Sequence, residues 1–142
     1  MTRLARLRVA ALAAGLILGM CHCSQDDTLP LAPSDCQTSK PDLGNLNIQV
    51  TIDAQNTRVP VAIYVGHIED GMLLQRDSLT VSSVDYSFPV DKAYTVTATY
   101  LVGQDTILAI AQDEIQTHET EYQNSTHCWD LINAAVDVRL KR

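Results

Sequence analysis

The chain has 142 residues, of which 46% are hydrophobic and 19% are charged. This length fits one domain, and this apolar content is enough for a core, so the composition argues against disorder over the whole chain. The formal net charge is -7, and such an acidic surface repels phosphate backbones, so nucleic acid is not an expected partner.

Residues 1–22 have the layout of a bacterial secretory signal. Arg3, Arg6 and Arg8 form a positive start, and an apolar run follows over residues 9–20. A membrane-spanning helix needs about 20 apolar residues, so this run is too short to be one. We therefore predict a signal peptide over 1–22. Its removal takes away three Arg and no acid, so 7 basic residues would face 17 acidic ones.

Two motifs lie at the end of the leader and directly after it. Leu18-Gly19-Met20-Cys21 resembles the lipobox of Gram-negative cell-envelope lipoproteins, and Cys23-Ser24-Gln25-Asp26-Asp27 resembles the start of many surface-exposed lipoproteins. The resemblance implies a lipid on either Cys21 or Cys23, and the choice between them stays open. Two or more acyl chains hold a protein stably at a membrane. The expected location is the cell envelope, with the outer membrane as the anchoring site and the domain facing the periplasm or the outside; the alternative is an ordinary secreted protein.

Residues 23–45 are polar and are interrupted by Pro30, Pro33 and Pro41. Polar stretches that contain proline behave as semi-extended spacers. We therefore predict a flexible tether here. The alternative is an irregular loop that packs on the domain, which the presence of Cys36 favours.

Alternating apolar residues predict strands through the rest of the chain. The most regular pattern lies at 94–102, and the others fall at 46–53, 59–65, 72–75, 79–81, 86–90, 106–112 and 136–140. Residues 103–105 are short enough for a hairpin loop. Residues 129–132 are interpreted as one helical turn. Seven or eight short strands with turns every ~8–12 residues predict an all-β fold, an antiparallel β-sandwich over 46–142.

Residues 57–64 and 86–96 are similar to the carboxypeptidase-regulatory-like (transthyretin-type) sandwich modules. The matching features are a proline-containing Val-rich strand, an aromatic-x-Phe strand and a Tyr-Thr-Val strand. The resemblance implies an Ig-like sandwich that binds or spaces other parts. It brings no catalytic residues.

If the leader ends at Cys21 or Cys23, two cysteines remain in the folded part, Cys36 and Cys128. Outside the cytoplasm such thiols pair, so we predict a Cys36–Cys128 disulfide. Closing a loop of this length is worth ~4–5 kcal/mol in the chain-entropy model.

Metal sites and catalytic constellations are not indicated. His118, His127 and Cys128 lack the paired spacing of zinc ligands, and His127 and Cys128 would point to opposite faces of a strand. The acidic pairs Asp26-Asp27 and Asp113-Glu114 lack the spacing of a calcium loop. With no nucleophile elbow and no phosphate-binding loop, we predict no cofactor, no metal and no enzymatic activity.

Two surfaces are candidates for binding. Tyr122 and Trp129 flank a polar loop and are a possible ligand surface for a sugar; the alternative places Trp129 in the core beside the disulfide. The face formed by Thr95, Thr97 and Thr99 is expected to be solvated. The predicted function is a lipid-anchored, non-enzymatic structural or binding protein, an accessory subunit of an envelope assembly, and such a subunit should have a long open sheet edge. The alternative is an adhesin module that binds a glycan or a peptide.

Overall fold

The computed structural model describes residues 29–141. The predicted signal peptide and both candidate lipidation sites, Cys21 and Cys23, lie outside these residues. The described chain forms eight strands and one short 3-10 turn, with these bounds: β1 Leu43–Gln49, β2 Val59–Val65, β3 Met72–Leu79, β4 Ser83–Pro89, β5 Lys92–Val102, β6 Asp105–Tyr122, η1 Gln123–Ser125, β7 Thr126–Ile132 and β8 Ala134–Asp137.

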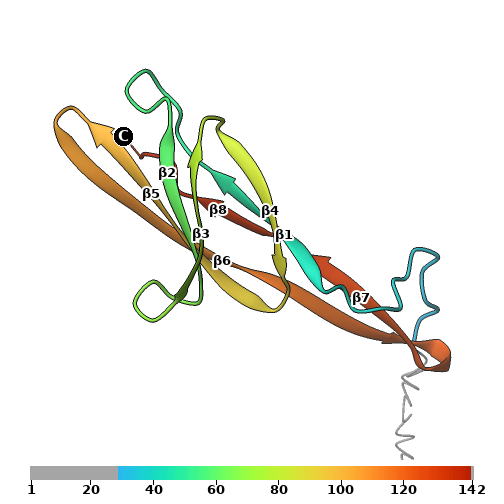
Figure 1. Cartoon of the computed structure of the whole chain (residues 1–142). Helices are drawn as coiled ribbons and strands as arrows, with labels where there is room; N and C mark the ends of the chain where they lie inside the picture. The colour runs from blue at the N-terminus through green and yellow to red at the C-terminus, as the bar shows by residue number, and fades with distance from the viewer. Residues whose placement is uncertain (1–28, 142) are drawn as a thin grey trace, which may run out of the picture.

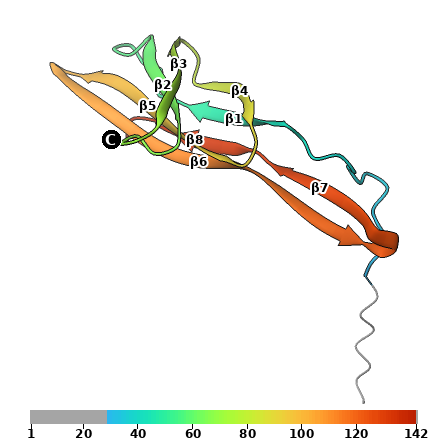
Figure 2. The ribbon, with the colours of Figure 1, turned by 60° about the horizontal axis from the view of Figure 1, so that its bottom comes forward.

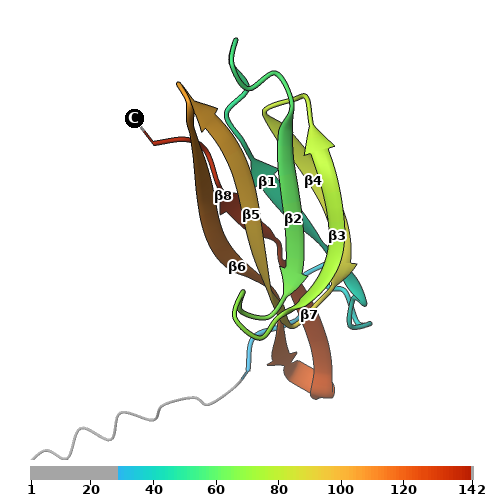
Figure 3. The ribbon, with the colours of Figure 1, turned by 60° about the vertical axis from the view of Figure 1, so that its left-hand side comes forward.

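The strands form two sheets packed face to face (Figure 3). The smaller sheet has the order β4-β1-β8, and the larger has the order β3-β2-β5-β6-β7. The predicted all-β sandwich is thereby confirmed. One pairing departs from the expected antiparallel pattern, because β8 runs parallel to β1.

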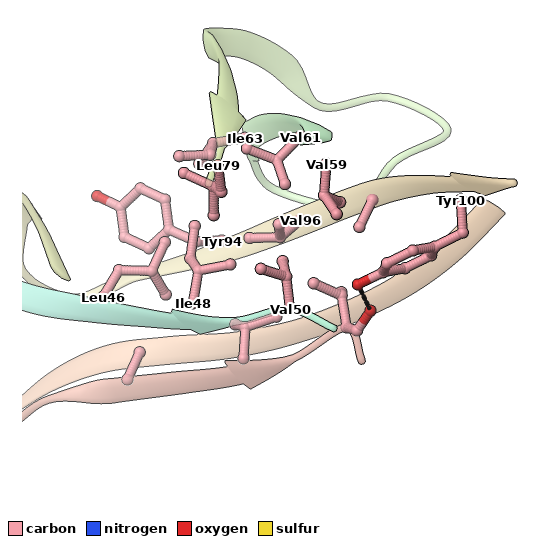
Figure 4. Packing of buried hydrophobic residues seen from close by; sticks show 14 of the residues in the cluster. Leu46, Ile48, Val50, Val59, Val61, Ile63, Leu79, Tyr94, Val96 and Tyr100 are labelled. Carbon is pink, nitrogen blue, oxygen red and sulfur yellow. Dashed lines mark hydrogen bonds between the residues drawn. The ribbon is translucent and has the colours of Figure 1, made fainter. Parts of the chain in front are cut away.

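The core consists of the inward-facing residues, which alternate along each strand. Figure 4 shows side chains of β1, β2 and β5 meeting between the layers. Fully buried members include Leu46, Ile48, Ile63, Val96 and Tyr100. The alternation that predicted these strands therefore identified their buried faces.

The buried hydroxyl of Tyr100 joins three segments. It donates to the carbonyl oxygen of Val138 over 2.8 Å, the bond drawn as a dashed line in Figure 4. The N–H of Thr51 donates to the same hydroxyl over 3.0 Å. Burial raises the pKa of Tyr100 above its usual value. The hydroxyl thus stays protonated and satisfies backbone groups where strand pairing has ended.

Several predicted elements need correction. The two short strands expected between residues 72 and 81 are one strand, β3, and the strand expected at 106–112 continues to Tyr122 as β6. Residues 129–132 belong to β7 and form no helical turn, because they pair with residues 116–119 of β6. The last strand ends at Asp137, although the chain beyond it still contacts β1 and the segment after it: Val138 N–H donates to Gln49 O, and Leu140 N–H donates to Thr51 Oγ1.

The threonine face of β5 is less solvated than expected. Thr95 and Thr97 are buried, and only Thr99 is partly exposed. The hydroxyl of Thr95 donates to Gly66 O over 2.6 Å and lies 3.2 Å from Gln112 Oε1. Neighbouring strands on both sides of β5 cover these short side chains, so the prediction of a solvated face was wrong for two of the three.

Beyond the sandwich, β6 and β7 form an arm that projects past the smaller sheet (Figure 2). The segment over residues 29–42 runs beside this arm (Figure 1). Gln123 N–H donates to Pro30 O, Trp129 N–H donates to Gln37 O, and the Cys36–Cys128 disulfide joins the segment to β7. The predicted disulfide is confirmed, with its Cα atoms 5.2 Å apart. This part of the chain matches the packed-loop alternative to a tether.

Candidate functional site: the open edge of β6

The longest strand, β6, changes partner along its length. Residues 105–115 pair with β5 on one side, and residues 116–122 pair with β7 on the other side. The opposite edge of residues 105–115 forms no ladder with any described residue. This stretch therefore has one paired edge and one open edge, which we call the β6 edge.

Two hydrogen bonds of β6 show which of its residues direct their backbone groups toward that edge. Ile115 O accepts from Asp91 N–H, and Thr117 N–H donates to Asp91 Oδ1, so odd-numbered residues direct their backbone groups toward the β5 side. In an antiparallel strand this direction alternates. The even-numbered residues therefore present theirs at the open edge; four of them have no backbone hydrogen bond there to any described residue: Thr106, Leu108, Ile110 and Gln112.

At the end of this stretch the edge becomes protected. Glu114 N–H donates to the neighbouring carboxylate of Asp113 over 2.9 Å, and the other oxygen of that carboxylate accepts from Ala135 N–H of β8 over 2.8 Å. The two sheets therefore touch at Asp113. Toward the hairpin tip they separate.

A groove of about 340 Å³ occupies this separation. One wall is β6 and the other is the end of β8 with the segment after it. The β6 wall carries small apolar side chains, because Ala109 and Ala111 line it and are half-buried. Val138 and Leu140 face them, and Arg139 forms a two-point ion pair with Asp137 at the rim. Hydrogen bonding to Arg139 lowers the pKa of Asp137, which keeps that pair charged.

The opposite side of the sandwich is closed. There β3 continues directly into β4, and the hydroxyl of Tyr86 in β4 donates to Asp77 Oδ2 of β3 over 2.6 Å. Burial, followed by this hydrogen bond, raises the pKa of Tyr86, and the same bond lowers the pKa of Asp77. The opening at the β6 edge is thus a feature of one side only.

The outward face beside the β6 edge is also apolar. Leu108 and Ile110 are 54% and 50% exposed, and Leu101 lies on the same face of the neighbouring β5 and is 50% exposed. Proteins usually protect exposed edges with Lys, Pro or a bulge. Residues 106–112 contain no charge and no proline, so this edge has none of those protections.

The free edge of β5 is treated differently. Pairing of β5 with β2 ends at Ala98, and side-chain amides replace the missing strand beyond it. Asn56 Oδ1 accepts from Leu101 N–H over 2.8 Å, and Asn56 Nδ2 donates to Leu101 O over 3.0 Å. Gln55 makes the same two bonds to Gly103, over 3.3 and 2.9 Å. Asn56 is buried and is itself held by Asp53, so this cap is rigid.

A carboxylate caps the place where β5 begins beside β6. Asp91 accepts from the N–H and the hydroxyl of Thr117, each over 2.8 Å, and pairs with Lys40 Nζ. These contacts lower the pKa of Asp91 to about 2. The hydrogen bond to Lys40 lowers it most, followed by the bonds to Thr117. This residue has a positive φ of 56°, a conformation that Asp and Asn tolerate better than most residues.

The predicted ligand surface is divided by the register of the arm. Tyr122 pairs with Thr126, and Trp129 pairs with Glu119, which places the two rings on opposite faces of the β6–β7 hairpin. Both are half-buried, and Lys40 Nζ lies 5.1 Å from the Trp129 ring centroid. Trp129 is not a member of the buried cluster, so its interpretation as a core residue was wrong.

The candidate metal ligands do not converge. Cys128 is in the disulfide, His127 Nδ1 lies 3.0 Å from Glu119 Oε1, and His118 contacts Thr120 on the other face. Asp113 and Glu114 are engaged at the β6 edge, and Asp26 and Asp27 lie outside the described residues. Within residues 29–141 no three His, Cys, Asp or Glu side chains are grouped as metal ligands.

A second, smaller depression lies on the outer face of the larger sheet. It measures about 260 Å³ and is lined by Tyr64, Arg76, Thr97 and Thr99 among others. Among the described residues no helix is long and apolar enough to cross a bilayer.

The β6 edge had one sequence signal that sequence reasoning did not use. Residues 106–112, Thr-Ile-Leu-Ala-Ile-Ala-Gln, are uncharged between Asp105 and Asp113 and do not alternate in polarity. A strand that faces solvent on one side should alternate. Comparisons with family models, with curated proteins and with solved structures find no match for this chain.

Proposed function

We propose that this chain is a lipid-anchored protein of the bacterial cell envelope with a non-enzymatic structural or binding role, and that it serves as an accessory subunit of an envelope assembly. The β6 edge is the observation that carries this proposal. It offers backbone donors and acceptors over four alternate residues, and strand addition to such an edge is a common mode of protein association.

The disulfide supports an extracytoplasmic location, because disulfides persist in oxidising compartments. The lipobox-like motif at Cys21 and the Cys-Ser-x-Asp-Asp motif at Cys23 support an N-terminal lipid. Anchoring by lipid would leave the whole folded domain available for contacts with other envelope proteins. The similarity to transthyretin-type modules fits a binding or spacing role and stays part of the proposal.

The adhesin alternative has less support. Sugar-stacking sites need aromatic rings that share one surface, and Tyr122 and Trp129 lie on opposite faces of the arm. The depression beside Arg76 and Tyr64 has one aromatic ring and a small volume. We therefore favour the subunit role over glycan binding.

The anchoring is tested by labelling growing cells with palmitate. We expect a labelled protein in the envelope fraction, with processing that is sensitive to globomycin and labelling that is lost in either Cys21→Ser or Cys23→Ser. The other single variant is the matched control. Cytoplasmic fractionation with no label and with Cys36 and Cys128 reduced would contradict the proposal.

A further inference from the structure

The β6 edge has the two parts of a strand-addition site, namely a row of backbone groups that no residue of 29–141 pairs with and a groove for side chains. The backbone groups belong to Thr106, Leu108, Ile110 and Gln112. Directly inside them, Ala109 and Ala111 are the smallest inward residues of β6. A strand laid against this edge would point every second side chain into the groove, between these alanines and Val138 and Leu140.

We infer that the β6 edge accepts an extended segment of another protein, with medium-sized apolar side chains at alternate positions, an uncharged centre and basic residues at its ends. This inference rests on the proposed function and names the chemistry of its partner. The added strand would extend the larger sheet beyond β6 and fill the opening between the sheets.

The charges around the edge select this partner. The uncharged stretch 106–112 ends in Asp105 on one side and in Asp113 and Glu114 on the other. Cross-strand pairs of opposite charge are favourable, so Lys or Arg at the ends of the incoming segment would match these acids.

The same charges disfavour a second copy of this chain. Antiparallel pairing of two β6 edges about their centre places Asp105 of one copy near Asp113 or Glu114 of the other. Like charges directly opposite destabilise a sheet, and the net charge of -7 adds a general repulsion.

Side chains cap the outer edge of β5 but leave most of the β6 edge uncapped, and this difference supports a binding site at the β6 edge. Asn56 and Gln55 satisfy the backbone of β5 at Leu101 and Gly103. On the β6 side, one side chain caps the edge, at Glu114, where the groove ends. Four residues nearer the hairpin tip are left open, and this is the length over which the groove runs.

The test uses the full 142-residue chain in detergent and a synthetic probe, acetyl-Lys-Val-Thr-Val-Thr-Val-Thr-Val-Lys-amide. Affinity is measured by titration up to about 1 mM, and amide hydrogen exchange is followed residue by residue. We expect saturable binding and at least tenfold slower exchange at the amides of Thr106, Leu108, Ile110 and Gln112. A probe with Glu in place of both Lys should bind at least threefold more weakly.

Matched variants connect the binding to the edge. Leu108→Pro removes an N–H that faces the open edge and keeps the bonds to β5, so we expect at least a tenfold loss of affinity. Leu108→Thr keeps that N–H and should bind within threefold of the parent. Ala109→Leu fills the groove and should also weaken binding at least tenfold, and circular dichroism checks that each variant folds.

Three results would overturn the inference. The first is the absence of protection at the four amides at the highest probe concentration. The second is equal binding by Leu108→Pro and the parent. The third is a dimer that forms through the edge and is lost in Leu108→Pro, since the occupant would then be a second copy. None of these measurements involves a lipid or a membrane, so failure here is distinguishable from failure of the envelope proposal.

Discussion

The two outer edges of the β5–β6 hairpin lie close together in sequence, but their backbone groups are satisfied in different ways. On the β5 edge, the amides of Asn56 and Gln55 replace a strand where β2 has ended. On the β6 edge, the corresponding backbone groups of residues 106–112 have no partner among the described residues, and a groove lies beside them. The difference indicates that the fold protects edges locally, one backbone group at a time, and that exposure on β6 is selective.

Further along, β6 itself becomes protected. Past Ile115 it pairs with β7, and the Cys36–Cys128 disulfide fixes β7 to the segment that runs beside it. The same strand thus has an open edge in one half, and in the other half it pairs with β7, which the disulfide fixes in place. Four comparisons measure how strongly each protected part differs from the open one.

The largest expected change in the free energy of unfolding comes from removing the Cys36–Cys128 disulfide. Replacing both cysteines with serine should lower the free energy of unfolding by about 4 kcal/mol, because the unfolded chain regains the entropy of a loop closed over 92 residues. Urea denaturation measures this. The reduced parent protein is the control and should match the double variant, and an unchanged urea midpoint would show that the arm does not depend on the bridge.

Removal of the buried cap comes second. Asn56→Ala leaves Leu101 N–H and C=O without partners and should cost about 3 kcal/mol. Gln55→Ala is the matched control, because Gln55 is exposed and water can replace its amide, so its cost should stay below about 1 kcal/mol. Equal losses in the two variants would mean that burial does not set the strength of these caps.

A proline pair compares the two edges directly. Leu101 and Leu108 are 50% and 54% exposed on the same face. Leu101→Pro removes an N–H that donates to Asn56 and should destabilise by about 2 kcal/mol, whereas Leu108→Pro removes an N–H from the open edge and should cost less than about 1 kcal/mol. Thermal unfolding measures both, and a larger loss for Leu108→Pro would show that the β6 edge is paired after all.

The smallest effect depends on pH and concerns the Asp91 cap. The folded pKa of Asp91 is lowered to about 2 from its usual value of 3.8, so its contribution to stability is present above pH 3.8 and is lost as pH falls through 2. Asp91→Asn keeps the side-chain shape and tolerates the positive φ, so it should remove part of the acid dependence between pH 4 and 2. The difference in urea midpoint between parent and variant, followed across this range, isolates Asp91; a constant difference would rule out the cap as a titrating contact.

Sequence periodicity predicted much of the fold. Residues 46–52, 59–65 and 94–102 alternate, and most of their apolar members lie in the core. The Cys36–Cys128 pairing followed from there being two cysteines in the folded part, beyond the candidate lipidation sites. Predictions were weaker where one strand serves two partners. Residues 106–112 are apolar on both faces, because one face borders the groove and the other borders the exposed leucines of the hairpin, and residues 129–132 have too short a pattern to separate a strand from a helical turn.

The sequence by itself determined the all-β class, the buried faces of the main strands and the disulfide, since each depends on a local period or on a count of residues. The tertiary structure alone decided which edges are covered, the change of partner at Ile115, the separation of Tyr122 from Trp129 and the groove beside Ala109 and Ala111. These depend on strand order and register, which are set by contacts between residues far apart in the chain and leave no periodic trace in it.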